Sequence, residues 1–333
     1  MMTRNKKTKL AISGAGMTGA YLYRVLKKEG YEAELFDLKR ISRCGLKPCA
    51  WGTSAGFIEL VKQAGLDAEK YILQRLDYVL MDDVRIKAEL MVFDKPQLVK
   101  DLLKDAEIHF TPLPLHRYDR VIDATGVSRV LLPPIKDDIV MGCRQYLIET
   151  REPLENRIKL GGIGYAWCFP LSRDLYHVGC GSLLADPQRI LKDLGWLEST
   201  SPQYEKKILC SCSGDIRLTG PFQSQPFVSE GTGEGIWGIG EAIGCVAPLA
   251  GDGVVPGMQS VQLLLKKWGK PQEYTNAILG EFRWMNDERG VIDKLRKAEA
   301  TGLQEARVLR KNSKRMGMRV GIREAVALLK NLR

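Results

Sequence analysis

The chain has 333 residues, of which 44% are apolar and 27% charged, which is ordinary globular usage and excludes a disordered or fibrous protein. Lys and Arg outnumber Asp and Glu by 50 to 40, and no run approaches the roughly 18 apolar residues of a membrane span. The length favours two domains, or one large α/β unit with an insertion. Eight cysteines without dense spacing favour reduced thiols, and residues 1–16 lack the long apolar run of a signal peptide, so we expect a cytoplasmic protein.

The first predicted unit is a strand, a helix and a second strand. The apolar run 9–13 leads into Gly14, Gly16 and Gly19, helical spacing follows, and a strand at 33–36 ends at Asp37. In G-x-G-x-x-G the glycines allow a tight turn, close backbone approach to a pyrophosphate and close helix–strand packing. A carboxylate at the end of the second strand accepts hydrogen bonds from the adenosine ribose. The predicted dinucleotide-binding residues are Gly14, Gly16, Met17, Thr18, Gly19 and Asp37.

The middle of the chain is predicted to be rich in β-structure. The predicted elements are, in chain order, a loop at 41–53, a helix at 55–64, a hairpin at 77–93, a helix at 94–105, a strand at 120–123 and an antiparallel sheet at 140–178. Because no flexible linker or repeat separates them, we expect the β-rich part to be inserted into the nucleotide-binding domain.

A second glycine-rich segment lies far along the chain. A strand at 235–240 leads into a glycine-studded loop, a helix at 257–268 follows, and the chain is predicted to be helical from Glu273. A nicotinamide dehydrogenase does not need this loop, whereas a flavoprotein does, because its ribityl phosphate and isoalloxazine ring lie far from the adenosine. The N-terminus of the following helix can stabilise negative charge at N1 and O2 of the reduced ring. We therefore predict FAD, held here by Gly240, Glu241, Gly251, Asp252, Gly253 and Val254.

These motifs, in this order, resemble the geranylgeranyl reductase family of hydroxylase-type flavoproteins, over about residues 9–288. Cys49-Ala50-Trp51-Gly52 is similar to the family's C-x-W-G stretch near the isoalloxazine, and the segment 165–170 is similar to its Y-x-W-x-F-P segment on the substrate sheet. Lys95 stands where the family usually has Arg, which loses the forked guanidinium geometry. Glu241 stands where the family usually has Asp, and the chain is shorter than typical members.

The resemblance implies a fold, an activity and further site residues. The implied fold is α/β: a Rossmann-like FAD-binding domain with an inserted antiparallel β-sheet substrate domain and a helical C-terminus. The implied activity is reduction of isoprenoid C=C bonds by hydride from N5 of reduced FAD, in a dry apolar channel. The further cofactor-binding residues are Cys49, Ala50, Gly52, Lys95, Ala124, Thr125 and Gly126. The catalytic candidates are Cys49, Trp51, Tyr165 and Trp167, and the substrate-binding candidates are Tyr165, Trp167, Phe169 and Pro170.

The expected domain organisation follows from these assignments. The FAD-binding domain comprises 1–76, 94–130 and 235–290, the substrate domain comprises the hairpin 77–93 and the segment 131–234, and a basic helical C-terminus occupies 291–333.

Much of the positive charge lies at the C-terminus. Residues 301–333 contain nine basic and two acidic residues, and Arg307, Arg310, Lys311 and Lys314 recur at helical spacing on one face. This face is either a solvated helix surface or a contact with anionic lipid, which would make the protein peripheral at the membrane. Nucleic acid is not expected, because no nucleic-acid module accompanies the patch.

Three further expectations concern the reaction. The dinucleotide motif occurs once, so electrons are expected from ferredoxin, a reduced deazaflavin or transiently bound NAD(P)H, and the substrate is expected to be a prenyl lipid or another apolar small molecule. With three histidines and no H-E-x-x-H, we expect no catalytic metal. Two alternatives stay open: a flavin monooxygenase or halogenase, since the segment 165–170 also resembles the halogenase W-x-W-x-I-P segment, and a non-catalytic FAD-bound electron-transfer subunit, favoured by the shortened substrate region.

Overall fold

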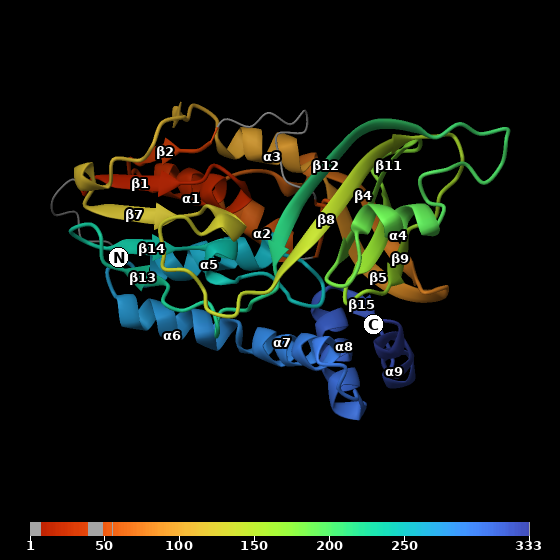
Figure 1. Ribbon diagram of the computed structural model, residues 1–333. Coiled ribbons are helices and arrows are strands. Elements are labelled where there is room, and N and C mark those ends of the chain that lie inside the picture. Colours follow the sequence, from red (N-terminus) through yellow and green to blue (C-terminus); the bar gives the residue numbers. More distant parts are fainter. Residues whose placement is uncertain (1–7, 39–48, 55, 333) are drawn as a thin grey trace.

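Two β-sheets lie end to end, with helices packed along both, in this computed structural model (Figure 1). The structure describes residues 8–38, 49–54 and 56–332. The predicted α/β fold, with a Rossmann-type domain, a large second sheet and a helical C-terminus, is confirmed. The described helices are α1 (Met17–Lys28), α2 (Gly56–Gln63), α3 (Lys95–Leu102), α4 (Pro187–Asp193), α5 (Val254–Lys266), α6 (Pro271–Glu281), α7 (Arg283–Arg296), α8 (Leu303–Arg315) and α9 (Ile322–Asn331).

The first sheet carries the N-terminal unit. Its strands, in spatial order, are β13 (Val228–Ser229), β14 (Ile236–Gly238), β7 (Arg120–Asp123), β1 (Leu10–Ser13), β2 (Glu34–Phe36) and β6 (Ile108–His109). All neighbours are parallel except β13 and β14. The chain leaves this sheet after β7 and returns to it only at β13, so the intervening β-rich part is an insertion, as the sequence predicts.

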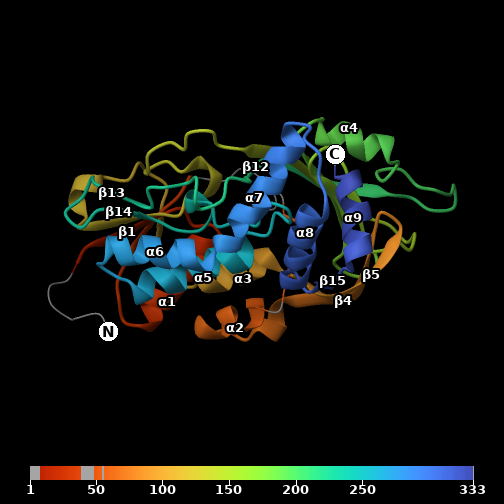
Figure 2. The same ribbon diagram turned by 90° about the horizontal axis from the view of Figure 1, so that it is seen from below.

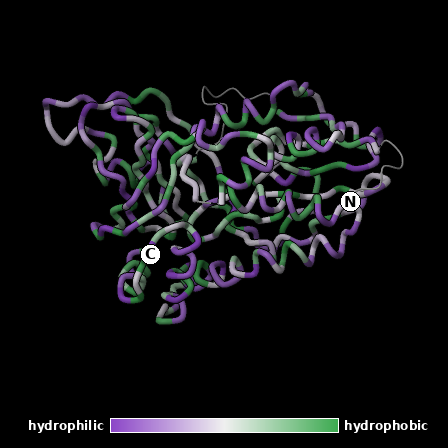
Figure 3. The backbone as a smooth tube through the Cα atoms, turned by 180° about the vertical axis from the view of Figure 1, so that it is seen from behind, coloured by the Kyte–Doolittle hydropathy of each residue, from purple (hydrophilic) through white to green (hydrophobic). Residues whose placement is uncertain are grey.

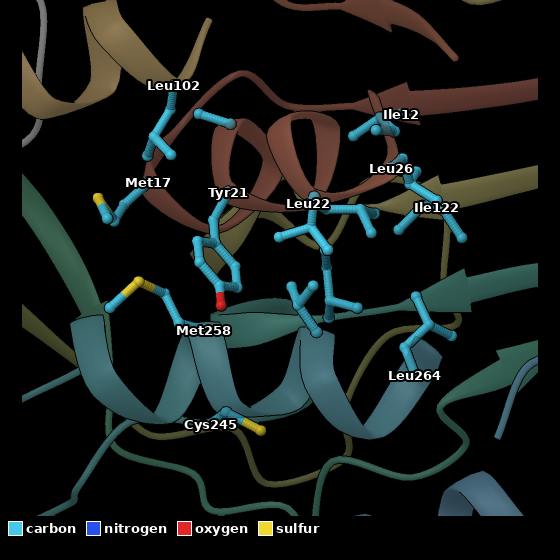
Figure 4. Close-up of a cluster of buried hydrophobic side chains, with 14 of the residues drawn as sticks. Ile12, Met17, Tyr21, Leu22, Leu26, Leu102, Ile122, Cys245, Met258 and Leu264 are labelled. Carbon is cyan, nitrogen blue, oxygen red and sulfur yellow. The ribbon is translucent and has the colours of Figure 1, made fainter. Parts of the chain in front are cut away.

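Helices α1 and α5 pack together beside the first sheet. Figure 4 shows Tyr21 and Leu22 of α1 facing Met258 and Leu264 of α5. All four side chains are fully buried in one hydrophobic cluster. The apolar positions of α1 recur every three or four residues, so one helix face is buried against α5 and the sheet. This packing brings the start of α1 close to the start of α5, although more than 230 residues separate them in the sequence.

The second sheet is larger and almost entirely antiparallel. Its strands, in spatial order, are β12 (Lys207–Arg217), β8 (Val140–Glu149), β11 (Leu175–Ser182), β10 (Tyr165–Pro170), β9 (Arg157–Leu160), β4 (Ile72–Met81), β5 (Val84–Phe93) and β15 (Met318–Arg319), and β3 (Gly52–Thr53) also pairs with β5. The pair β4–β9 is parallel. One face of this sheet is covered by α4 and the opposite face meets the C-terminal helices.

The C-terminal helices are part of the sheet's core. Seen from below in Figure 2, α7, α8 and α9 lie across the second sheet. Val291, Leu309 and Leu328, one from each helix, share a buried cluster with Trp167 and Phe169 of β10. Figure 3 shows hydrophilic and hydrophobic residues alternating along these helices, as expected when one face is buried and the other exposed. No helix in the described ranges is both long and apolar enough to cross a membrane.

Several boundaries differ from the sequence predictions. The hairpin begins at Ile72, five residues earlier, because two bulges in its first strand interrupt the alternation of apolar residues. Helix α5 begins at Val254 rather than Gly257. The predicted helix 94–105 ends at Leu102. The sequence analysis did not predict α4 or β12, and β15 interrupts the predicted C-terminal helices.

Candidate functional site

The first glycine loop, between β1 and α1, is built for close backbone packing. Gly14 has φ +105°, and a Cβ there would lie 2.4 Å from the Ala124 carbonyl oxygen. A Cβ on Gly19 would lie 1.9 Å from the Gly14 carbonyl oxygen. Gly16 is the N-cap of α1, and no side chain caps the helix and no acidic residue lies in its first turn. The first backbone N–H groups of α1, including that of Met17, are therefore available to an anion.

One aspartate holds this loop, and a second holds the neighbouring turn after β7. The Asp37 carboxylate accepts hydrogen bonds from the backbone N of Ala15 at 3.1 Å and of Leu38 at 2.7 Å. Asp123, fully buried at the end of β7, accepts from the backbone N and the hydroxyl of Thr125, at 3.0 and 2.6 Å. Asp37 therefore lies beside the loop, whereas the Thr125 side chain is engaged inside the 123–126 turn.

The second glycine segment meets the first at Thr18. A Cβ on Gly240 would lie 2.8 Å from the Thr18 hydroxyl oxygen, and a Cβ on Gly257 would lie 2.5 Å from the same atom. Glycine at both positions lets the first turn of α1 pack directly on the second glycine segment and on α5. The two loops predicted to hold opposite parts of one dinucleotide are thus neighbours in space.

The loop before α5 also touches the second sheet. The Tyr165 hydroxyl donates a hydrogen bond to the Ala250 carbonyl. A Cβ on Gly251 would lie 3.2 Å from that hydroxyl, and Gly251 has φ +64°. Gly251 therefore has the left-handed conformation that glycine favours, and it lies against Tyr165 of β10.

The segment 49–53 also contacts the second sheet, at β10 and β11. A Cβ on Gly52 would lie 3.6 Å from the Phe169 ring. The Trp51 ring packs edge-on against His177, with centroids 4.4 Å apart, and Trp51 has φ +57°. Cys49 is half-buried and interacts electrostatically with Tyr165. Ala50 packs against the buried cluster that contains Trp167 and Phe169.

The three aromatic residues of the segment 165–170 lie on one face of β10, which we call the aromatic face. Tyr165, Trp167 and Phe169 pair with Gly181, Gly179 and His177 of β11, so the three aromatic side chains alternate to the same face. A Cβ on Gly179 would lie 2.3 Å from the Trp167 ring, so the indole lies directly over the backbone of β11. Pro170 occupies the alternate register and faces the other way, so the structure does not bring it together with the three aromatic residues.

Asp252 lies at the start of α5, and Lys95 at the start of α3 interacts with it electrostatically. Asp252 is buried, and its carboxylate accepts a hydrogen bond from the Val254 backbone N at 3.0 Å. Burial raises the pKa of Asp252 to about 6, opposed by hydrogen bonds from Val254 and Val255 and by the charge of Lys95. Lys95 opens α3, as predicted, with Asp94 capping the backbone N of Gln97. Gly253 is the N-cap of α5.

Arg217, at the end of β12, joins three parts of the site. Its Nε donates to the Asp138 carboxylate at 3.0 Å, Nη1 donates to the Glu241 carbonyl at 2.9 Å, and Nη2 donates to the Val127 carbonyl at 2.7 Å. The Glu241 side chain accepts from the Arg217 backbone N at 2.8 Å. One oxygen of the Glu241 carboxylate is therefore engaged within the protein. A Cβ on Gly126 would lie 3.2 Å from the other oxygen.

Glu288 of α7 holds the loop before α5 by a hydrogen bond. It is 1% exposed, and its carboxylate accepts a hydrogen bond from the Leu249 backbone N at 3.2 Å. Burial raises the pKa of Glu288 to about 8, opposed by that hydrogen bond and by the charge of Arg315. The C-terminal helices thus contact the loop that precedes α5.

Eleven buried side-chain polar atoms have no hydrogen-bond partner among the described residues. They include Thr53 Oγ1, Gln145 Oε1, Trp167 Nε1 and His177 Nδ1, which belong to strands β3, β8, β10 and β11 of the second sheet. Each such atom costs about 1–3 kcal/mol unless a ligand or water bonds to it. Burial lowers the pKa of His177 to about 4, although a hydrogen bond with the Ala50 backbone opposes this. The described residues contain no group of three or more His, Cys, Asp or Glu that could hold a metal ion.

Sequence reasoning missed His177, Gln145, Arg217 and Glu288. Gly179 and Gly181 could have indicated that another group lies close to β11, because glycine inside a strand marks a close approach. The other side chains gave none, since their partners lie on distant elements.

The comparisons with known proteins identify the fold. No known family model matches the sequence. An uncharacterised protein of Methanocaldococcus jannaschii is 25% identical, over 87% of this chain and 90% of its own length. A geranylgeranyl bacteriochlorophyll reductase-like protein of Thermoplasma acidophilum superposes with a TM-score of 0.63 at 16% identity, covering 98% of this chain and 99% of its own. Tryptophan 6-halogenase of Streptomyces toxytricini gives 0.64 at 14% identity, covering 98% and 90%. The chain therefore has the fold of the FAD-binding flavoproteins.

Proposed function

We propose that this chain binds FAD and uses the reduced flavin to reduce C=C bonds of a prenyl lipid or a similar apolar molecule. The observation that carries the proposal is the meeting of the two glycine loops at Thr18, with the later loop also touching Tyr165. One extended dinucleotide could therefore span from the α1 N-terminus to the aromatic face of the second sheet. The structural similarity to a geranylgeranyl bacteriochlorophyll reductase-like protein supports the same reaction class.

The residues fit this cofactor and reaction. Gly14, Gly16 and Gly19 leave the backbone N–H groups at the start of α1 open to the pyrophosphate, and Asp37, which lies beside this loop, would accept hydrogen bonds from the adenosine ribose. When bound, FAD supplies the hydride at N5. Tyr165 and Trp167 would exclude water from the reaction site and would bind the apolar chain, because aromatic side chains bury large areas without needing hydration.

The first prediction tests this reaction directly. The purified protein should show the twin visible absorption bands of a flavin. After anaerobic reduction, a geranylgeranyl lipid should gain two hydrogens for each reduced bond, measured by mass spectrometry. Ferredoxin, a reduced deazaflavin and NAD(P)H are the donors to compare. Absence of flavin would defeat the whole proposal, whereas bound flavin without any mass gain under every donor would defeat the substrate class.

A matched pair of glycine variants sharpens this test. Gly179→Ala places a methyl group 2.3 Å from the Trp167 ring and should lower turnover at least tenfold while FAD stays bound. Gly290→Ala, on α7 with no atom within 4 Å of the added methyl group, should change neither turnover nor FAD binding. Equal turnover in both variants would remove Trp167 from the substrate site.

The similarity to tryptophan 6-halogenase favours one alternative, a flavin-dependent halogenase or monooxygenase. Such an enzyme consumes oxygen in proportion to its substrate, whereas the proposed reductase transfers hydride without oxygen. Oxygen uptake with the candidate substrate therefore separates the two. A holoprotein with no turnover in either assay would favour an electron-transfer subunit.

We also propose that the basic face of α8 contacts anionic lipid, which would bring the protein to the surface where a prenyl lipid resides. Arg307, Arg310, Lys311 and Lys314 are all exposed, and none forms an ion pair within the described part of the chain. Each basic residue near such a surface contributes about 1 kcal/mol. The four charges share one helix face, so they can contact a surface together.

The second prediction concerns this face. The triple variant R310Q/K311Q/K314Q should bind phosphatidylserine vesicles roughly 100-fold more weakly, since about 3 kcal/mol is lost. The triple variant K62Q/K70Q/K100Q, which removes three exposed lysines elsewhere, should bind as the unaltered protein does. Binding of the unaltered protein should also weaken as salt is raised. Equal binding to uncharged phosphatidylcholine vesicles would contradict the role of charge.

A further inference from the structure

We propose that Asp252 sets the protonation state of the reduced flavin, favouring uptake of a second proton when bound FAD accepts two electrons. This inference rests on the proposed function, because it requires the isoalloxazine ring to lie at the start of α5. It assigns to Asp252 a role in positioning charge, beyond contact with the cofactor.

The two helix N-termini at the site differ in charge. At α1, Gly16 is the N-cap, no side chain caps the helix, and no acidic residue lies in the first turn. At α5, Gly253 is the N-cap, but the carboxylate of Asp252 accepts from the Val254 backbone N at 3.0 Å and also bonds to the Val255 backbone. A helix N-terminus carries about half a positive charge, which a full carboxylate charge outweighs. The start of α1 therefore attracts anions. The start of α5 does not, contrary to the sequence prediction that this helix N-terminus stabilises negative charge, because the Asp252 carboxylate occupies it.

Few other charges face Asp252. The described groups that interact with it electrostatically are Lys95, at the start of α3, and Tyr165, on β10. Lys95 forms no ion pair with Asp252 within 4 Å among the described residues, so it offsets the carboxylate only in part. Burial raises the pKa of the Tyr165 hydroxyl, which is therefore neutral at physiological pH. With the pKa of Asp252 at about 6, its carboxylate is mostly ionised at neutral pH.

The consequence follows from the proton balance of flavin reduction. FAD takes up two electrons with one proton to give an anion whose charge lies at N1 and O2, or with two protons to give a neutral reduced ring. Free reduced flavin loses the N1 proton near neutral pH. A carboxylate near that end of the ring destabilises the anion, because like charges raise the pKa of the neighbouring acid. The ring therefore keeps both protons to higher pH.

The test is the reduction potential of the holoprotein between pH 6 and 9. For a two-electron couple, each tenfold change in proton concentration shifts the potential by about 30 mV for every proton taken up. The unaltered holoprotein should follow about 60 mV per pH unit through pH 8, since two protons accompany two electrons. Asp252→Asn should change to about 30 mV per pH unit above neutrality, because the anion is then stabilised by the α5 N-terminus.

Glu281→Gln is the matched control. Glu281 is an exposed carboxylate at the C-terminal end of α6, outside the candidate site. Its substitution should leave the slope unchanged. If Asp252→Asn fails to retain FAD, Asp252→Ser keeps a hydrogen-bond acceptor without the charge. A one-proton slope for the unaltered holoprotein at pH 7–8, or equal slopes with and without Asp252, would overturn the inference while leaving FAD binding intact. Failure of the unaltered protein to bind FAD would instead defeat the proposed function.

Discussion

Gly19→Ala is expected to weaken FAD binding by roughly 100-fold, which corresponds to about 3 kcal/mol. The added Cβ would lie 1.9 Å from the Gly14 carbonyl oxygen and 3.2 Å from the Ala124 side chain. Gly14 is in the loop that holds the pyrophosphate in the proposed complex, and Ala124 lies in the turn after β7. Relief of the clash must therefore move α1 away from that loop. The backbone N–H groups at the start of α1 would then no longer reach the phosphates. The measurement is the dissociation constant of FAD, from flavin fluorescence during titration of the apoprotein.

Gly280→Ala is the control, because it adds the same methyl group to a helical glycine outside the site. Gly280 lies in α6, and a Cβ there meets no atom within 4 Å. Replacing a helical glycine with alanine should raise stability by about 0.4–1 kcal/mol and leave FAD binding unchanged. Gly19→Ala that binds FAD normally would show that the first glycine loop does not hold the cofactor.

The N-terminal unit could be predicted from sequence because its determinants are local. The strand, the glycines, the helix and Asp37 follow one another within about 30 residues, at spacings that the phosphate and ribose impose. The same reasoning located the second glycine loop and the aromatic strand, because Tyr165, Trp167 and Phe169 alternate at the strand period. It could not show that the two loops meet at Thr18, since that contact depends on how α5 packs on α1.

Other elements were missed for physical reasons that particular residues illustrate. Strand β12 contains small and polar residues such as Cys210 and Gly214, and its β-structure comes from pairing with β8, which local propensity does not encode. Helix α5 was placed three residues late because Pro256 and Gly257 are typical of a turn. In the structure Pro256 lies in the first turn of α5, where a missing N–H costs nothing.

Arg217 shows why some site residues have no sequence signal. It is 3% exposed and bonds to Asp138, 79 residues earlier in the chain. Its carbonyl partners belong to Val127 and Glu241, in the segments that follow β7 and β14. No spacing rule connects these positions. The chain therefore encodes the glycine loops locally, and the contacts of Arg217 arise only in the completed fold.

Arg217→Ala is expected to lower the free energy of unfolding by about 3–5 kcal/mol, as removal of one partner from a buried ion pair does. Burial alone would raise the pKa of Asp138, but hydrogen bonds from Arg217 and Thr219 hold it below its ordinary value. Without the guanidinium this carboxylate is left unpaired in a partly buried site, and the Val127 and Glu241 carbonyls lose their donors. The measurement is urea unfolding followed by circular dichroism.

The exposed pair Arg189–Asp193 provides the matched control for this arginine. Its side chains are 80% and 70% exposed, and Arg189→Ala should cost no more than about 0.5 kcal/mol. Asp138→Asn in the Arg217→Ala background should recover part of the loss, because the unpaired charge is then removed together with its partner. Recovery would assign the loss to the buried charge, whereas an undiminished loss would assign it to the two carbonyl contacts. An Arg217→Ala protein as stable as the control would show that the contacts of Arg217 with Asp138, Val127 and Glu241 do not stabilise the fold.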